Sequence, residues 1–221
     1  MVAVLTADLL NSTKYSEDFL TQVLDALKSE IEGIASSDKN TNFELYRGDS
    51  IQGVIEPIAS FRSALRIKTA VNKLRSQTAI DSNSYRIEAD LRISIGIGSI
   101  EFERDSIRES NGEAFQFSGR TLDEMQKTGR KMMLKSAIDA VNAEFDNTFL
   151  LFDTITERWS TASAEVIYYL LKGMIEIEIA EALGISQSAV NQRKKAAGWD
   201  AIESLINRYE QIMKQYFTDG E

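Results

Sequence analysis

The sequence of 221 residues contains no cysteine and no histidine. It therefore has no disulfides, no thiolate nucleophile, no Ser-His triad and no zinc site built from Cys and His. Any chemistry must use carboxylates, Lys, Arg, hydroxyls or a metal ion. Because oxygen-only ligand sets suit hard cations, a metal here would be Mg²⁺, Mn²⁺ or Ca²⁺ rather than a softer ion. We expect Mg²⁺ or Mn²⁺ as the cofactor, and no haem, flavin or zinc.

Long apolar runs and a basic leader are also missing. The sequence therefore predicts neither a membrane span nor a secretory signal, and we expect a cytoplasmic protein that does not engage a membrane. The hydrophobic content of 43% is enough for a core, and the net charge of −9 argues against a surface covered with nucleic acid. One basic face remains compatible with that charge.

Strand and helix patterns alternate over the first 137 residues. This order is typical of an α+β fold of the palm or ferredoxin-like kind, in which an antiparallel-rich sheet is backed by helices. The expected elements are a strand from Val2 ending at Asp8, a helix over 16–34, the strands FELYR and SIQGVI around Gly48-Asp49, a helix from Pro57 to about Gln77, a strand within 85–102, a helix from Gly112 to about Lys127, and the short strand KMMLKS.

The strand within 85–102 has two unlike faces. From Leu91 onward, apolar residues alternate with a series that contains Gly96 and Gly98. These glycines leave one face bare, which predicts the close approach of another backbone or of a ligand.

After about Ala137, helix signals dominate to the end of the chain. The pattern of residues 138–159 predicts a connecting helix, and we place a domain boundary near residue 155. This gives a palm-like domain over 1–155 and an all-α domain over 156–221.

The all-α segment contains a helix-turn-helix pattern. A short helix ends at Leu183, a turn follows through Gly184 to Ser186, and a second helix begins near Gln187. The stretch resembles the DNA-binding helix-turn-helix of sigma-factor region four. That resemblance implies a set of residues that face double-stranded DNA: Gln187, Ser188, Asn191 and Gln192 in the major groove, and Arg193, Lys194 and Lys195 at phosphates or base edges.

A function other than DNA binding is also compatible with this segment. Residues 157–221 carry seven Lys or Arg against ten Asp or Glu, a net charge of −3, so that positive charge is concentrated in the one basic triplet. A helix-turn-helix can also serve for dimerisation or docking. We favour DNA binding because the triplet falls where phosphate neutralisation requires it.

Two aspartates end neighbouring strands in the N-terminal segment. Asp8 closes the first strand and Asp49 sits on the hairpin, so the two carboxylates can converge, and a divalent cation would relieve their repulsion while holding phosphate oxygens. The turn LLNST supplies N–H groups and hydroxyls near a helix N-terminus, which favours phosphate. Alternatively, Asp8 only caps the turn and Asp49 only shapes the hairpin.

Four stretches, ADLLNST, YRGDSIQGVI, LRISIGIGSIEF and GEAFQFSGRTLDEM, resemble in this order the signature blocks of class III nucleotide cyclases, over most of residues 2–125. A cyclase-like palm domain followed by a helix-turn-helix is similar to the SatD family of bacterial proteins, which are generally described as regulators. The resemblance implies a palm domain that holds metal on paired aspartates and that pairs as a homodimer.

The resemblance also implies roles for individual residues. Metal would be bound by Asp8, Asp49 and the Leu9 carbonyl, and Arg120 would stabilise charge on the transferred phosphate. The nucleotide would contact Asn11, Ser12, Thr13, Gly48, Glu109 and Gln116. Considered singly, Arg120 could be a solvated helix residue, and Gln116 and Glu109 could be surface residues.

Two functions follow from these features. In the first, which we favour, a DNA-binding regulator senses a nucleotide and magnesium through its palm domain. In the second, the palm domain is catalytic and is a nucleotidyl cyclase or a related nucleotidyltransferase acting on a nucleoside triphosphate. We favour the first because Leu45 replaces the polar residue that helps these cyclases to read the purine.

Overall fold

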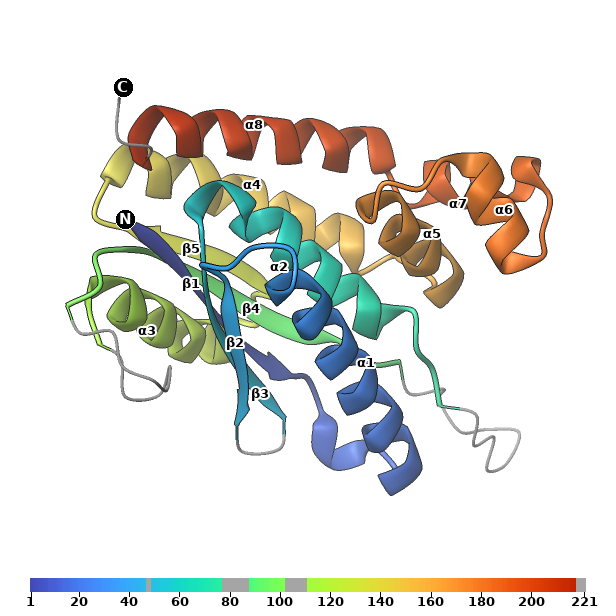
Figure 1. The fold of residues 1–221 in the computed structure, drawn as a ribbon, viewed down its shortest axis with the longest axis horizontal. Helices are drawn as coiled ribbons and strands as arrows, with labels where there is room; N and C mark the ends of the chain where they lie inside the picture. Colours follow the sequence, from blue (N-terminus) through green and yellow to red (C-terminus); the bar gives the residue numbers. More distant parts are fainter. Residues whose placement is uncertain (47–48, 77–87, 102–110, 218–221) are drawn as a thin grey trace.

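The computed structural model describes residues 1–46, 49–76, 88–101 and 111–217. Helices pack around one β-sheet (Figure 1). The strands are β1 (Val2–Leu9), β2 (Asn42–Tyr46), β3 (Ser50–Ile55), β4 (Leu91–Gly98) and β5 (Met132–Ser136). The helices are the 3-10 turn η1 (Ser12–Lys14), α1 (Glu17–Ala35), α2 (Pro57–Asn72), α3 (Glu113–Thr128), α4 (Asp139–Thr156), α5 (Thr161–Leu171), α6 (Glu176–Leu183), α7 (Gln187–Ala196) and α8 (Trp199–Phe217).

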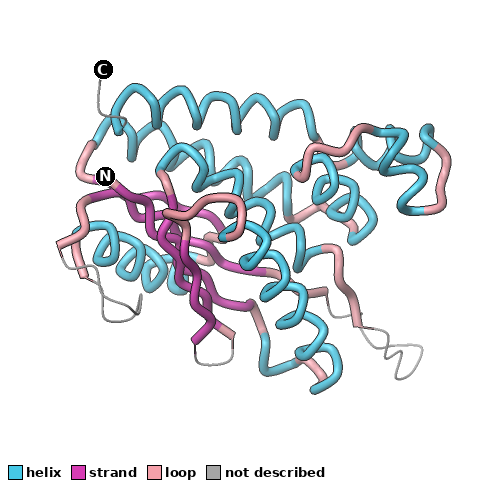
Figure 2. Tube along the Cα trace, in the orientation of Figure 1, coloured by secondary structure: helices cyan, strands magenta, loops and turns pink. Residues whose placement is uncertain are grey.

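The five strands, coloured magenta in Figure 2, form one sheet. Their order is β2-β3-β1-β4-β5. The pairs β2–β3, β3–β1 and β1–β4 are antiparallel, and only β4–β5 is parallel. The first four strands, with α1 and α2, follow the β-α-β-β-α-β order of a ferredoxin-like sheet. The predicted α+β class, with an antiparallel-rich sheet backed by helices, is confirmed.

The central strands face two helical layers. Alternate residues of β1, such as Leu5 and Leu9, lie in the main core with Val23 of α1 and Leu65 of α2. Val4, on the opposite face, packs against α3. Because side chains alternate along a strand, Asp8 shares the face of Val4 and lies on the side of α3.

The bare face of β4 receives the backbone of α3. A Cβ atom at Gly96 would overlap the carbonyl oxygen of Ala114 and the amide nitrogen of Ser118. Ser94, on the same face, donates a 2.6 Å hydrogen bond to the Ser118 carbonyl. Of the two expectations for this face, close approach of another backbone is the one that the structure shows.

The variant Gly96→Ala is expected to lower the free energy of unfolding by about 1–3 kcal/mol, because the added methyl group forces α3 away from β4. Gly33→Ala is the matched control, since a Cβ atom at Gly33 in α1 meets nothing within 4 Å. The control should raise stability by about 0.5–1 kcal/mol through helix propensity. Urea denaturation of both variants measures the difference, and equal stability of Gly96→Ala and wild type would contradict the packing.

Two elements are shorter than the sequence predicts. Helix α2 ends at Asn72 rather than near Gln77, and β4 runs from Leu91 to Gly98 within the predicted 85–102. The strand begins where the alternation of apolar residues begins. Residues 77–87 and 102–110 lie outside the described part of the chain.

Helix α8 contributes to the same core as the sheet. It runs beside α4 (Figure 1), and the ring of Tyr209 lies 4.9 Å from that of Phe145, centroid to centroid. The Tyr209 hydroxyl lies 2.7 Å from the Ser60 hydroxyl of α2, and Arg62 pairs with Glu210 at 3.0 Å. The predicted boundary near residue 155 therefore falls in the last turn of α4, with shared core on both sides.

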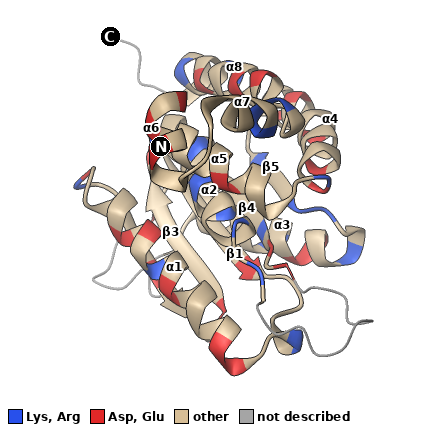
Figure 3. Cartoon of the chain, turned by 90° about the vertical axis from the view of Figure 1, so that its right-hand side faces the viewer, with Lys and Arg blue, Asp and Glu red and all other residues tan. Residues whose placement is uncertain are grey.

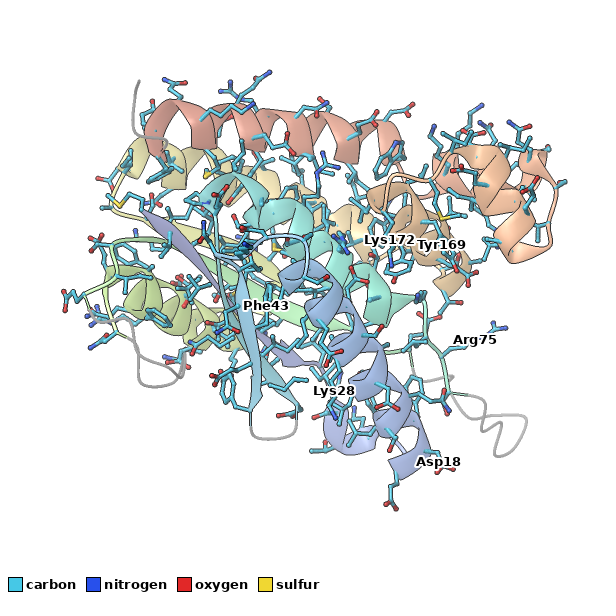
Figure 4. All side chains as sticks on the ribbon, in the orientation of Figure 1. Asp18, Lys28, Phe43, Arg75, Tyr169 and Lys172 are labelled. Carbon is cyan, nitrogen blue, oxygen red and sulfur yellow. The ribbon has the colours of Figure 1, made fainter. Side chains whose placement is uncertain are left out.

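Helix α5 joins α1 and α2 through a buried polar cluster. Glu30 of α1, with a side chain 2% exposed, accepts hydrogen bonds from Arg66 at 2.7 Å and from the Tyr168 hydroxyl at 2.8 Å. Lys172, labelled at the end of α5 in Figure 4, donates to the Tyr168 hydroxyl at 3.1 Å.

None of the helices in the described residues is long and apolar enough to cross a membrane.

Candidate metal centre

Asp8 and Asp49 come together at one end of the sheet. Asp8 is paired with Ser50 across β1 and β3, and Asp49 directly precedes Ser50 in the chain. The backbone N–H of Leu9 donates to the Asp49 carbonyl at 3.2 Å. The structure therefore brings the two predicted carboxylates to adjacent positions.

The two oxygens of the Asp8 carboxylate have different surroundings. Oδ2 accepts from Arg92 Nη1 at 3.1 Å and from Gln126 Nε2 at 3.5 Å. Oδ1 is buried and has no hydrogen-bond partner among the described residues. Burial raises the pKa of the Asp8 carboxyl; Arg92 and Gln126 lower it, Asp49 raises it, and the net shift is upward.

Asp49 is held by the turn that follows β1. Ser12 donates its hydroxyl to Asp49 Oδ2 at 2.8 Å. The predicted phosphate-binding turn forms η1 rather than the start of α1, and Asn11 precedes η1 with a left-handed backbone of φ 55°. Within the described residues, the Lys14 N–H donates to the Asn11 carbonyl at 2.9 Å and the Tyr15 N–H donates to the Ser12 carbonyl at 3.0 Å, which closes this turn.

A divalent cation fits this donor set. The unpartnered Oδ1 of Asp8 and the neighbouring carboxylate of Asp49 are hard oxygen donors of the kind that Mg²⁺ and Mn²⁺ prefer. The Leu9 carbonyl belongs to the same strand end. In the described part of the chain, no three carboxylates gather into a ready-made metal cage, so water or phosphate oxygens would have to complete the coordination.

Of the other residues that the resemblance assigns, Ser12 contacts the pair through Asp49. Arg120 and Gln116 are exposed on α3, and no ion pair joins Arg120 to Asp8 or Asp49 among the described residues. Gly48 and Glu109 lie outside the described residues.

Sequence reasoning missed Arg92 and Gln126 as neighbours of Asp8. The alternation of β4 places Arg92 on the face of Gly96, which is the face of α3. The available signal in the sequence was one charged residue, Arg92, among small or polar residues on the same face of β4. Gln126 had no comparable signal, because its position depends on where α3 crosses the sheet.

A second charged cluster supports the strand ends behind the pair. Lys68 of α2, 1% exposed, binds the carboxylate of Asp90, which also accepts from Asn72 at 2.8 Å and from Lys131 at 3.0 Å. Burial opposes ionisation of Asp90, but Lys68 and Lys131 outweigh it and hold the pKa of Asp90 well below its usual range. The Asp90 carbonyl accepts from the Leu10 N–H at 2.8 Å, which ties this cluster to the end of β1.

The predicted DNA-facing residues lie on α7 (Figure 3). Lys194 pairs with Glu176 of α6 at 3.1 Å, and Arg193 pairs with Glu165 of α5 at 3.9 Å. Four of the set are exposed and two more are partly buried around Glu176. The exposed residues are Gln187, Ser188, Gln192 and Lys195, and the partly buried ones beside Glu176 are Asn191 and Lys194.

No protein-family model and no curated protein matches the chain. Among solved structures, the GGDEF domain of DgcB from Caulobacter crescentus in complex with c-di-GMP is 12% identical, with a TM-score of 0.42 over 62% of this chain and 77% of that one. The GGEEF domain of a diguanylate cyclase from Vibrio cholerae is 13% identical, with a TM-score of 0.40 over 62% and 83%. The guanylate cyclase domain of RhGC from Catenaria anguillulae in complex with GTP is 17% identical, with a TM-score of 0.37 over 55% and 71%. These likenesses concern the fold alone, and nothing about ligand or activity is drawn from them.

Proposed function

We propose that the sheet domain binds a nucleoside triphosphate together with Mg²⁺ or Mn²⁺ and acts as a class III-like nucleotidyl cyclase or a related nucleotidyltransferase. The observation that carries this proposal is the carboxylate pair, in which Asp8 and Asp49 are adjacent and one buried oxygen of Asp8 has no partner in the part of the chain that the structure describes. An unpartnered buried carboxylate oxygen is costly unless a ligand completes it.

Each part of the site has a distinct role in this proposal. Asp8 and Asp49, with the Leu9 carbonyl, would hold the cation, which supplies Lewis-acid stabilisation of phosphate charge. The backbone N–H groups of Asn11, Ser12 and Thr13 would donate hydrogen bonds to the phosphate oxygens. This arrangement favours the catalytic function over the sensor function, because the residues nearest the pair serve metal and phosphate rather than a base.

The direct test is an incubation of purified protein with each of the four nucleoside triphosphates and Mn²⁺, with pyrophosphate release as the readout. Release of pyrophosphate, together with a cyclic or dinucleotide product, supports the catalytic function. Binding of nucleotide and Mn²⁺ without release supports a sensor domain, and no binding of either contradicts the proposed site.

DNA binding is a second candidate function, which the arrangement of α6 and α7 favours. Gly184 ends α6 with a left-handed backbone of φ 63°, and Ser186 caps α7 by accepting from the Ala189 N–H. The helices pack on α5 through a small apolar cluster that includes Ile179 and Val190. The exposed polar face of α7 would then be the element that enters a major groove.

Replacing Arg193, Lys194 and Lys195 together by Ala is expected to weaken duplex binding and to flatten its dependence on salt. If all three neutralise phosphates, the slope of log K against log[salt] falls by about 2.7. Because Glu176 and Glu165 already pair with two of them, a fall nearer 0.9 would show that Lys195 alone contacts phosphate. Fluorescence anisotropy at several salt concentrations measures the slope.

The matched control replaces three exposed lysines elsewhere, Lys28, Lys39 and Lys214, by Ala. It changes the net charge equally and leaves the α7 face intact, so its salt slope should equal that of wild type. A wild-type protein without salt-sensitive duplex binding contradicts the DNA-binding function.

A further inference from the structure

Arg92 occupies the residue position directly opposite Asp8. The two are register partners across β1 and β4, with the guanidinium 3.1 Å from Oδ2 and side chains 14% and 20% exposed. Arg92 Nε is buried and has no hydrogen-bond partner among the described residues. Among the described residues, the ion pair with Asp8 is therefore the contact that holds the Arg92 guanidinium in place.

The contacts of Asp8 are one-sided. Arg92 and Gln126 both reach Oδ2, whereas Oδ1 is buried and has no partner among the described residues. A carboxylate that is held at one oxygen keeps its orientation, and its second oxygen is left without a competing hydrogen bond from these groups. Groups that hold a metal ligand in this way act from outside the coordination sphere and commonly tune metal affinity.

Arg92 also supplies the positive charge that the pair needs before metal binds. Asp8 and Asp49 are like charges at adjacent strand ends, and Ser12 gives Asp49 a hydroxyl donor but no charge. Without Arg92, the side chain of Asp8 would keep, among the described residues, Gln126, a neutral donor 3.5 Å away. A free carboxylate would then be able to rotate and lose the geometry that presents Oδ1.

We propose that Arg92 is a positioning residue of the metal centre, which holds Asp8 through Oδ2 so that Oδ1 is the oxygen offered to a divalent cation; this inference rests on the proposed function of the pair. Arg92 does not itself touch the metal. The opposite arrangement, in which Arg92 occupies the metal's place and must leave, predicts a change of metal affinity in the opposite direction.

The test measures Mn²⁺ affinity of the full chain by titration calorimetry and by the loss of the free Mn²⁺ signal in electron paramagnetic resonance, without nucleotide. Arg92→Gln is expected to weaken Mn²⁺ binding about 10-fold to 100-fold. Arg92→Lys keeps the charge but loses the planar fork, and it should weaken binding about threefold. This partial rescue separates positioning by charge and shape from a general loss of structure.

Arg62→Gln is the matched control, because it breaks another arginine ion pair. That pair joins Arg62 of α2 to Glu210 of α8 at 3.0 Å. It should bind Mn²⁺ as wild type does. Thermal melting confirms that each variant folds, and if Arg92→Gln does not fold, the affinity of Arg92→Lys decides. An affinity equal to or tighter than that of wild type in the folded Arg92 variant overturns the inference.

Failure of the proposed function gives a different result. If wild-type protein binds Mn²⁺ saturably and Asp49→Asn removes that binding, the metal centre stands, whatever Arg92 does. If wild-type protein binds no Mn²⁺, both the metal centre and the role of Arg92 are overturned.

Discussion

The variant Asp49→Asn is expected to lower metal-dependent turnover of a nucleoside triphosphate by at least about 100-fold, which corresponds to about 2.7 kcal/mol of transition-state stabilisation. The amide keeps the shape of the side chain and can still meet the Ser12 hydroxyl, which lies 2.8 Å from Oδ2. It removes the negative charge that a divalent cation needs. Pyrophosphate release under saturating Mn²⁺ measures the loss.

Asp25→Asn is the control for this variant, because Asp25 is an exposed aspartate of α1. It makes the same chemical change away from the strand ends and should keep full activity. Turnover by Asp49→Asn within about threefold of wild type would show that Asp49 is not a metal ligand, since loss of a ligand charge costs more.

The variant Asp49→Asn also tests whether Arg120 acts from a second copy of the chain. Arg120 is exposed and, among the described residues, makes no ion pair with Asp8 or Asp49, so in a homodimer a partner copy would bring it to the phosphates. Arg120→Ala and Asp49→Asn should then each be inactive, and a mixture of the two should recover activity. A mixture that stays inactive although mixed dimers form places Arg120 outside the site.

The variant Asp90→Asn is expected to lower the free energy of unfolding by about 3–5 kcal/mol at pH 7, because it leaves the buried ammonium of Lys68 without its counter-charge. Asp146→Asn is the control. It also removes a carboxylate from an ion pair, with Arg130 at 3.1 Å, but its side chain is 63% exposed. Exposed pairs contribute up to about 1 kcal/mol, so the two variants should differ clearly in urea denaturation.

The cost of Asp90→Asn should also depend on pH. Because the pKa of Asp90 is well below its usual range in the folded protein, its contribution to stability is present above the unfolded pKa, near 4. It is lost progressively as the pH falls below that value towards the folded pKa. The difference between wild type and Asp90→Asn should therefore shrink between about pH 4 and pH 3, and a difference that stays constant over this interval would contradict the assignment.

The elements of the sheet domain follow closely from local patterns. The alternation from Leu91 set the start of β4, α1 spans Glu17–Ala35 where a helix over 16–34 is predicted, and Pro57 begins α2. The convergence of Asp8 and Asp49 was also accessible, because strand ends and hairpin tips have recognisable sequences. These features depend on a few consecutive residues.

The rest depended on contacts between distant segments. Arg92 became a neighbour of Asp8 only through the register of β1 and β4, and Gln126 only through the path of α3. Glu176 reaches Lys194 because α6 and α7 fold back on each other, so the basic triplet is less free than its sequence indicates. Such contacts have no local pattern.

The position of α8 has a consequence for how the chain is made. Helices α5, α6 and α7 lie in the sequence between α4 and α8, and both of these flanking helices contribute to the core that Tyr209 and Phe149 share. Helix α5 also belongs to this core, through residues such as Ala164 and Ile167. A nascent chain cannot complete the packing on α2 and α4 until α8 has been synthesised, so this core is completed only after α5–α7 have been made.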